Sequence, residues 1–109
     1  LLATALRETE EELAIQVESE DVLGQLPVVK TRLGFEITPF VSVLPSAPKY
    51  EPAENEVGEV LEMPFTSLLS TQQRDVGSKP EGVMYWFQHH RIWGASAKIL
   101  NQISHLSSY

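Results

Sequence analysis

The sequence predicts a single α/β domain, and three features of its 109 residues support this fold class. An opening segment, residues 3–16, is rich in strong helix formers and contains neither Gly nor Pro. Two segments with β-strand character follow, at residues 22–29 and 35–44. A second long helix is expected after Gly94, so that strands lie between two helices, as in α/β domains.

The opening helix has an apolar stripe along one side. Its members recur at intervals of four, three and four residues, which places them above one another, and they are Leu2, Leu6, Thr9 and Leu13. The first residue is already apolar and has no capping residue before it. We therefore expect the chain to begin inside a larger structure, with part of the sheet that covers the stripe lying upstream.

The middle of the chain alternates between strands and loops. Apolar residues occupy every second position from Phe35 to Val43, which favours a half-buried strand. Residues 31–34 supply a turn before it, and residues 45–55 hold three prolines, which predicts a surface loop able to shape a binding mouth. The remaining expectations are a strand at 57–63, a short helix from Pro64 to Leu69, a polar loop at 71–82, and two strands around His89 and His90 within 83–93.

Composition excludes several classes of protein. The chain has no cysteine, so it has neither a disulfide framework nor a thiolate metal site, and this fits a cytoplasmic protein. A formal net charge of −7 argues against binding along a nucleic-acid backbone. No apolar run approaches the roughly 20 residues of a membrane-spanning helix. A small anionic substrate remains compatible, provided that divalent cations lie between carboxylate and phosphate.

A cluster of glutamates on the opening helix is the most informative feature. At about 100° per residue, Glu8, Glu11 and Glu12 share a face opposite the apolar stripe. Like charges at this spacing repel, and their hard oxygens suit Mg²⁺ or Mn²⁺. The structural alternative is a solvated acidic face that is relieved by Arg7 and by the helix N-terminus.

The order of these residues resembles the second half of the Nudix box. In that motif an Arg-Glu pair is followed one helical turn later by a Glu-Glu pair, and then by a glycine and an apolar residue. The matching positions here are Arg7, Glu8, Glu11, Glu12 and Ile15. Thr9 stands at an apolar position of the motif and Ala14 stands at its glycine, a change expected to alter how the helix ends. The first half of the box, with its glycine loop and first glutamate, is absent from the sequence.

The resemblance extends over nearly the whole chain. Four further segments are similar to the coenzyme A diphosphatase branch of the Nudix superfamily, and they are residues 34–39, 55–60, 63–65 and 92–97. The last of them, Ile-Trp-Gly-Ala-Ser-Ala leading into the final helix, is the most specific to the branch.

This resemblance implies a fold, an activity and a set of site residues. The fold is a Nudix α/β/α sandwich with a mixed, curved sheet, of which residues 1–109 form a partial domain lacking the first strands. The activity is metal-dependent hydrolysis of coenzyme A or its thioesters to 3′,5′-ADP and 4′-phosphopantetheine. Glu8 and Glu12 are the principal Mg²⁺ or Mn²⁺ ligands, and Glu11 is a further ligand or the base. Arg7 orients the carboxylates, and Glu56 is an additional metal-ligand candidate.

Two rival functions remain. The substrate is alternatively another nucleoside diphosphate derivative such as ADP-ribose, because substrate choice lies in loops. From a different class, the chain is a Nudix-fold domain that binds a partner without catalysis. The isolated chain is expected to be a poor enzyme, and a homodimer is one way for it to cover its leucine stripe.

Several other residues have both a structural and a functional interpretation. His89 and His90 are adjacent, so on a strand they would face opposite ways, and a turn position is favoured over a catalytic pair. Four aromatic residues favour core packing over stacking on a nucleobase, and they are Tyr85, Trp86, Phe87 and Trp93. Lys30 and Arg32 flank a turn, where surface solubilisation is favoured over contact with a phosphate.

Overall fold

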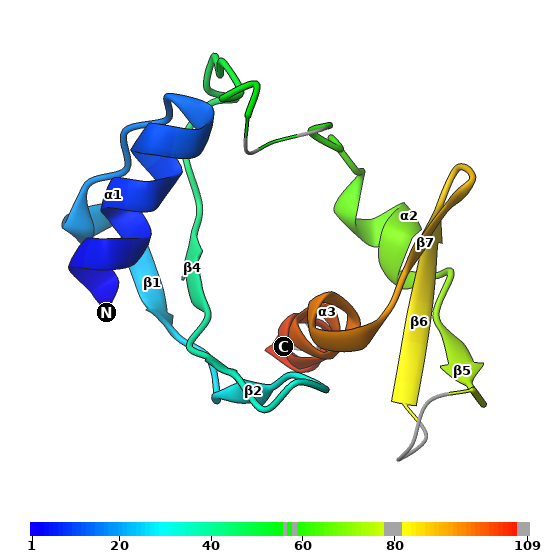
Figure 1. Ribbon diagram of the computed structural model, residues 1–109. Coiled ribbons are helices and arrows are strands. Elements are labelled where there is room, and N and C mark those ends of the chain that lie inside the picture. Colours follow the sequence, from blue (N-terminus) through cyan, green and yellow to red (C-terminus); the bar gives the residue numbers. More distant parts are fainter. Residues whose placement is uncertain (56, 58, 78–81, 107–109) are drawn as a thin grey trace. The chain divides into compact units, whose positions relative to one another are not determined.

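The structure is a computed structural model that describes residues 1–55, 57, 59–77 and 82–106 (Figure 1). The described part contains three α-helices, one 3-10 helix and seven strands. In chain order these are α1 (Leu2–Leu13), η1 (Ser19–Asp21), β1 (Val22–Gln25), β2 (Val29–Lys30), β3 (Glu36–Ile37), β4 (Phe40–Ser42), α2 (Phe65–Leu69), β5 (Gln73–Asp75), β6 (Gly82–Phe87), β7 (His90–Ile92) and α3 (Gly94–Leu106). No helix of the described residues is long and apolar enough to cross a membrane.

The strands form three small sheets, and every pair is antiparallel. β1 pairs with β4, β2 pairs with β3, and β5, β6 and β7 form a three-stranded sheet in that order. The α/β composition is therefore confirmed, whereas within the described residues the single mixed sheet is replaced by these three sheets. Three of the four strand pairs have short connections, and short connections permit only antiparallel pairing.

The chain divides into two compact units. Unit 1 comprises Leu1–Leu26 and Phe40–Leu61, and unit 2 comprises Pro27–Pro39 and Glu62–Tyr109. In unit 1, α1 lies against β1 and β4, and side chains from all three elements line a cavity of about 250 Å³. No residue of α1 is fully buried, so its leucine stripe is only partly removed from water.

Unit 2 holds the better-packed core. Leu68 of α2, Tyr85 of β6 and Ala97 of α3 are buried together, and Tyr85 has no exposed surface. The partly buried residues packed around them are Met63, Leu69, Val83, Phe87, Ile92 and Leu100. The buried tyrosine hydroxyl accepts a 2.7 Å hydrogen bond from Nε2 of Gln72, so the core contains no unpaired phenol. This core holds α3 on β6.

Sequence patterns located most elements of unit 2 correctly. The turn at 31–34, the helix after Pro64, the two strands around the histidine pair and the helix after Gly94 are all confirmed. The strand expected at 57–63 is wrong for its described residues, 57 and 59–63, which are irregular. A strand within the expected polar loop, β5, was missed because its sequence, Gln-Arg-Asp, has no β-branched or aromatic residue.

Prolines explain why two long predicted strands are each divided in two. The segment 22–29 gives β1 and β2, with Pro27 between them, and 35–44 gives β3 and β4, with Pro39 between them. A proline has no N–H to donate to a neighbouring strand, so it interrupts the ladder. In both segments the division also separates unit 1 from unit 2.

Candidate functional site

The helix α1 carries the candidate metal-binding residues. On its apolar side it also carries one polar residue, Thr9, whose hydroxyl has a hydrogen-bond partner within the helix. The hydroxyl of Thr9 donates a 2.8 Å hydrogen bond to the backbone carbonyl of Ala5. Thr9 also lines the apolar cavity of unit 1 with Leu6. Because its hydroxyl is already bonded, the threonine can stand at an apolar position without leaving an unpaired polar group.

The helix ends at Ala14 in the conformation that a glycine would adopt. Ala14 has φ 58° and ψ 28°, in the left-handed region, and its backbone N–H donates to the Glu10 carbonyl at 2.9 Å. This arrangement is a common helix C-terminus, usually made by glycine. The expectation that alanine would change how the helix ends is therefore wrong, because the alanine accepts the strained backbone instead.

The glutamates lie on the polar side of this helix. Glu8 and Glu11 are exposed and Glu12 is half-buried. The guanidinium of Arg7 approaches both exposed carboxylates, with Nη2 at 3.9 Å from Glu8 Oε1 and Nε at 3.8 Å from Glu11 Oε1. These long, exposed ion pairs contribute little to stability. The orienting role of Arg7 stays a prediction.

The proline-rich loop, residues 45–55, is attached to the C-terminal end of α1. The backbone N–H of Glu51 donates to the Leu13 carbonyl at 2.8 Å, and that of Ala53 donates to the Glu12 carbonyl at 2.7 Å. The last carbonyls of a helix have no partner within the helix. The loop supplies that partner, and so one of its sides lies beside Glu12.

The donor set is chemically suited to a hard divalent cation. Mg²⁺ is commonly held by one or two protein carboxylates together with water and phosphate, which Glu8 and Glu12, one turn apart, can provide. Among the residues that the structure describes, no group of three acidic or histidine side chains is arranged to hold an ion. The additional candidate, Glu56, lies outside the described residues. Glu59 is exposed and has interactions of its own.

Known proteins with sequences similar to nearly the whole chain are Nudix hydrolases. The chain is 37% identical to the uncharacterized Nudix hydrolase NudL of Cronobacter sakazakii over 110 aligned positions. It is 36% identical to the NudL proteins of Citrobacter koseri and Klebsiella pneumoniae over the same length. Each alignment covers 95% of this chain. Nearly the whole chain is therefore similar to these Nudix hydrolases.

The chain spans 57% of the length of each of these relatives. No protein-family model and no solved structure matches it. The half-motif on α1 and the long alignment agree on the Nudix relationship.

The structure decides between the alternatives for the histidines and aromatic residues. His89 lies in the turn between β6 and β7 and His90 begins β7, as a turn position requires, but their rings do not face opposite ways, because the ring centroids are 4.2 Å apart. Core packing is confirmed for Tyr85 and wrong for Trp93, which is 47% exposed. The guanidinium of Arg91 lies 5.5 Å from the Trp93 ring centroid.

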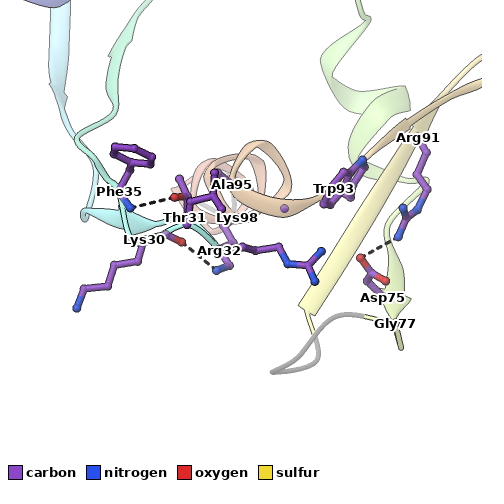
Figure 2. A pocket seen from close by; sticks show the side chains of 12 residues that line it. Lys30, Thr31, Arg32, Phe35, Asp75, Gly77, Arg91, Trp93, Ala95 and Lys98 are labelled. Atoms are coloured by element: carbon purple, nitrogen blue, oxygen red, sulfur yellow. Dashed lines mark hydrogen bonds and ion pairs between the residues drawn. The ribbon is translucent and has the colours of Figure 1, made fainter.

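Unit 2 contains a second cavity that the sequence did not indicate (Figure 2). The cavity has a volume of about 910 Å³. Its lining comes from the turn after β2, the end of β5, the end of β7 and the first turns of α3. Lys30 and Arg32 are among the lining residues, together with Arg91 and Lys98, which sequence analysis did not select. Lys30 and Arg32 are far from Arg91 and Lys98 in the sequence, and only the folded chain brings the two pairs together.

Proposed function

We propose that this chain provides the metal-binding helix of a Nudix enzyme that hydrolyses the diphosphate linkage of coenzyme A or its thioesters. The products are 3′,5′-ADP and 4′-phosphopantetheine. The observation that carries the proposal is the arrangement on α1, where Arg7 lies within 4 Å of two of the three clustered glutamates. A partial Nudix domain over residues 1–109 is part of the same proposal.

Each residue of the cluster has a role in this proposal. Glu8 and Glu12 hold a Mg²⁺ or Mn²⁺ ion, and Glu11 is a further ligand or the base that accepts a proton from the attacking water. Arg7 orients the carboxylates through its contacts with Glu8 and Glu11. A bound divalent ion supplies charge neutralisation on the phosphate oxygens and activation of water. Glu56, which follows the loop attached to α1, is proposed as an additional acid at this site.

Two segments support a substrate of the coenzyme A class. Residues 34–39 and 92–97 resemble the coenzyme A diphosphatase branch, and both contribute to the lining of the cavity in unit 2. Phe35 comes from the first segment, and Trp93 with Gly94 comes from the second. Segments that differ between branches of one family are expected to contact the part of the substrate that differs.

A panel of diphosphates tests this proposal in the protein that carries this chain. Coenzyme A, acetyl-coenzyme A, ADP-ribose and a dinucleoside diphosphate are each assayed with Mg²⁺ and with Mn²⁺. We expect the fastest turnover with coenzyme A or its thioester, and no turnover in the presence of EDTA. Faster hydrolysis of ADP-ribose would move the protein to another Nudix branch. Tight metal binding with no hydrolysis of any diphosphate would favour a binding domain without catalysis.

A further inference from the structure

The cavity in unit 2 has a charge opposite to that of the whole chain. Four cationic side chains line it among the described residues, and they are Lys30, Arg32, Arg91 and Lys98. The one acidic side chain in that lining is Asp75. It is buried, and its Oδ2 accepts a 3.0 Å hydrogen bond from Nη2 of Arg91. A chain with a net charge of −7 therefore presents a locally positive cavity, which favours an anionic ligand.

The cations of the cavity differ in their contacts and directions. Lys98 is held at the cavity edge, because its Nζ donates a 3.3 Å hydrogen bond to the Lys30 carbonyl. Figure 2 shows Arg32 extending from its turn toward the side of the cavity that carries Trp93 and Asp75, whereas the Lys30 ammonium points away. Lys98 uses one of its three N–H donors on Lys30, so Arg32 and Lys98 are the two lining cations that can still bind an anion inside the cavity. A guanidinium and an ammonium together suit a phosphate group.

The first turn of α3 adds backbone groups to the same cavity. Gly94 and Ala95 both line it, and they begin a helix of 13 residues. The first N–H groups of a helix have no partner within the helix, and the helix dipole favours negative charge at this end. The start of α3 therefore adds to the positive charge that Arg32 and Lys98 give the cavity.

Two exposed aromatic side chains complete the lining. Phe35 is 66% exposed and Trp93 is 47% exposed, although large aromatic residues normally gain stability from burial. Arg91 lies against the Trp93 ring and is itself bonded to Asp75, so these three side chains support one another. An exposed indole beside a positive cavity provides a stacking surface for a planar ring that carries a phosphate.

We propose that the cavity lined by Arg32, Lys98 and Trp93 binds a phosphorylated nucleoside, with the phosphate at the two cations and the base against the indole. This inference rests on the proposed function only for the choice of adenosine as the nucleoside, since coenzyme A and its thioesters contain an adenosine phosphate. It requires no metal ion, because the cations belong to the protein. The cavity volume of about 910 Å³ is ample for a single nucleotide.

Equilibrium binding without metal tests this site. Adenosine 3′,5′-bisphosphate, adenosine and inorganic phosphate are titrated into the chain in EDTA by isothermal calorimetry. We expect the bisphosphate to bind most tightly, and Arg32→Gln and Lys98→Gln each to weaken it about tenfold through loss of a charge-assisted contact. Lys49→Gln is the matched control, because Lys49 is an exposed cation in unit 1 and does not line the cavity. Circular dichroism confirms that each variant is folded.

Two further variants have separate purposes. One separates the contribution of the base to binding from that of the phosphate, and the other separates this cavity from the candidate metal site on α1. Trp93→Leu should weaken adenosine 3′,5′-bisphosphate several-fold and leave inorganic phosphate unchanged. Glu8→Gln should leave metal-free binding of the bisphosphate unchanged, so a failure of the hydrolase proposal would not affect this result. The inference is overturned if Arg32→Gln and Lys98→Gln bind like Lys49→Gln. It is also overturned if inorganic phosphate binds as tightly as the nucleotide.

Discussion

The backbone N–H of Ala53 donates a 2.7 Å hydrogen bond to the carbonyl of Glu12, a candidate metal ligand. This bond joins the proline-rich loop to the end of α1, and a second one from Glu51 to Leu13 reinforces it. Because a helix end leaves its carbonyls unpaired, the loop stabilises α1 where Glu12 lies. The position of this glutamate thus depends on a loop distant in sequence.

Replacing Ala53 by proline should weaken this attachment. Proline has no N–H, so the Glu12 carbonyl loses its partner, and we expect the free energy of unfolding to fall by about 1–3 kcal/mol. Ala53→Gly keeps the N–H and should cost less than about 1 kcal/mol. Urea denaturation followed by circular dichroism measures both. Equal losses in the two variants would mean that the hydrogen bond does not hold the loop.

Replacing Ala14 by glycine should stabilise the chain. Ala14 has a left-handed backbone, which costs an alanine roughly 1 kcal/mol relative to a glycine. We therefore expect Ala14→Gly to raise the free energy of unfolding by about 0.5–1 kcal/mol. Ala14→Val should lower it, because a β-branched residue adopts this conformation still less readily. Changes of opposite sign in the thermal stability of the two variants would establish that Ala14 ends the helix in a left-handed conformation. A loss of stability in Ala14→Gly would contradict it.

Local patterns predicted the three α-helices and the β6–β7 hairpin, because their signals lie within a few residues of one another. Thr9 and Ala14 show the limit of such patterns, since both depart from the Nudix box and both are accommodated by backbone geometry that composition does not reveal. The positive cavity shows a second limit. Arg32 and Lys98 become neighbours of one cavity only through the packing of α3 near β2. Trp93 has an apolar sequence context, and nothing local indicates that it lies at a cavity edge.

The glutamate cluster should bind Mn²⁺ through Glu8 and Glu12. In the protein that carries this chain, Glu8→Gln and Glu12→Gln should each lower hydrolysis on the order of 10³-fold by removing a ligand. Glu10→Gln is the matched control, because Glu10 is an exposed glutamate on the same helix that points away from the cluster. Titration of Mn²⁺ by electron paramagnetic resonance should show weaker binding in Glu8→Gln and Glu12→Gln than in Glu10→Gln. The assignment fails if all three variants stay within tenfold of the unsubstituted protein.

The ion pair of Asp75 with Arg91 should be important for unit 2. The Asp75 side chain is 7% exposed, so replacing its partner leaves a buried charge without compensation. We expect Arg91→Met to lower the free energy of unfolding by about 2–4 kcal/mol, and Asp75→Asn by about 1–3 kcal/mol. Combining the two substitutions should cost less than the sum of the single losses. Additive losses in urea denaturation would show that the two side chains do not interact.

The exposed edge of β1 should cause the 109-residue chain to self-associate. β1 and β4 pair with each other, and in the described part of the chain neither has a second neighbouring strand. Leu23 of β1 is 73% exposed, so an apolar side chain lies beside unpaired backbone groups. Static light scattering should show a mass that rises with concentration, and Leu23→Lys should lower it by adding a charge to the edge. Leu33→Lys is the control, because Leu33 is 85% exposed but lies on a turn. A constant monomer mass, or an equal effect of both substitutions, would exclude association through this edge.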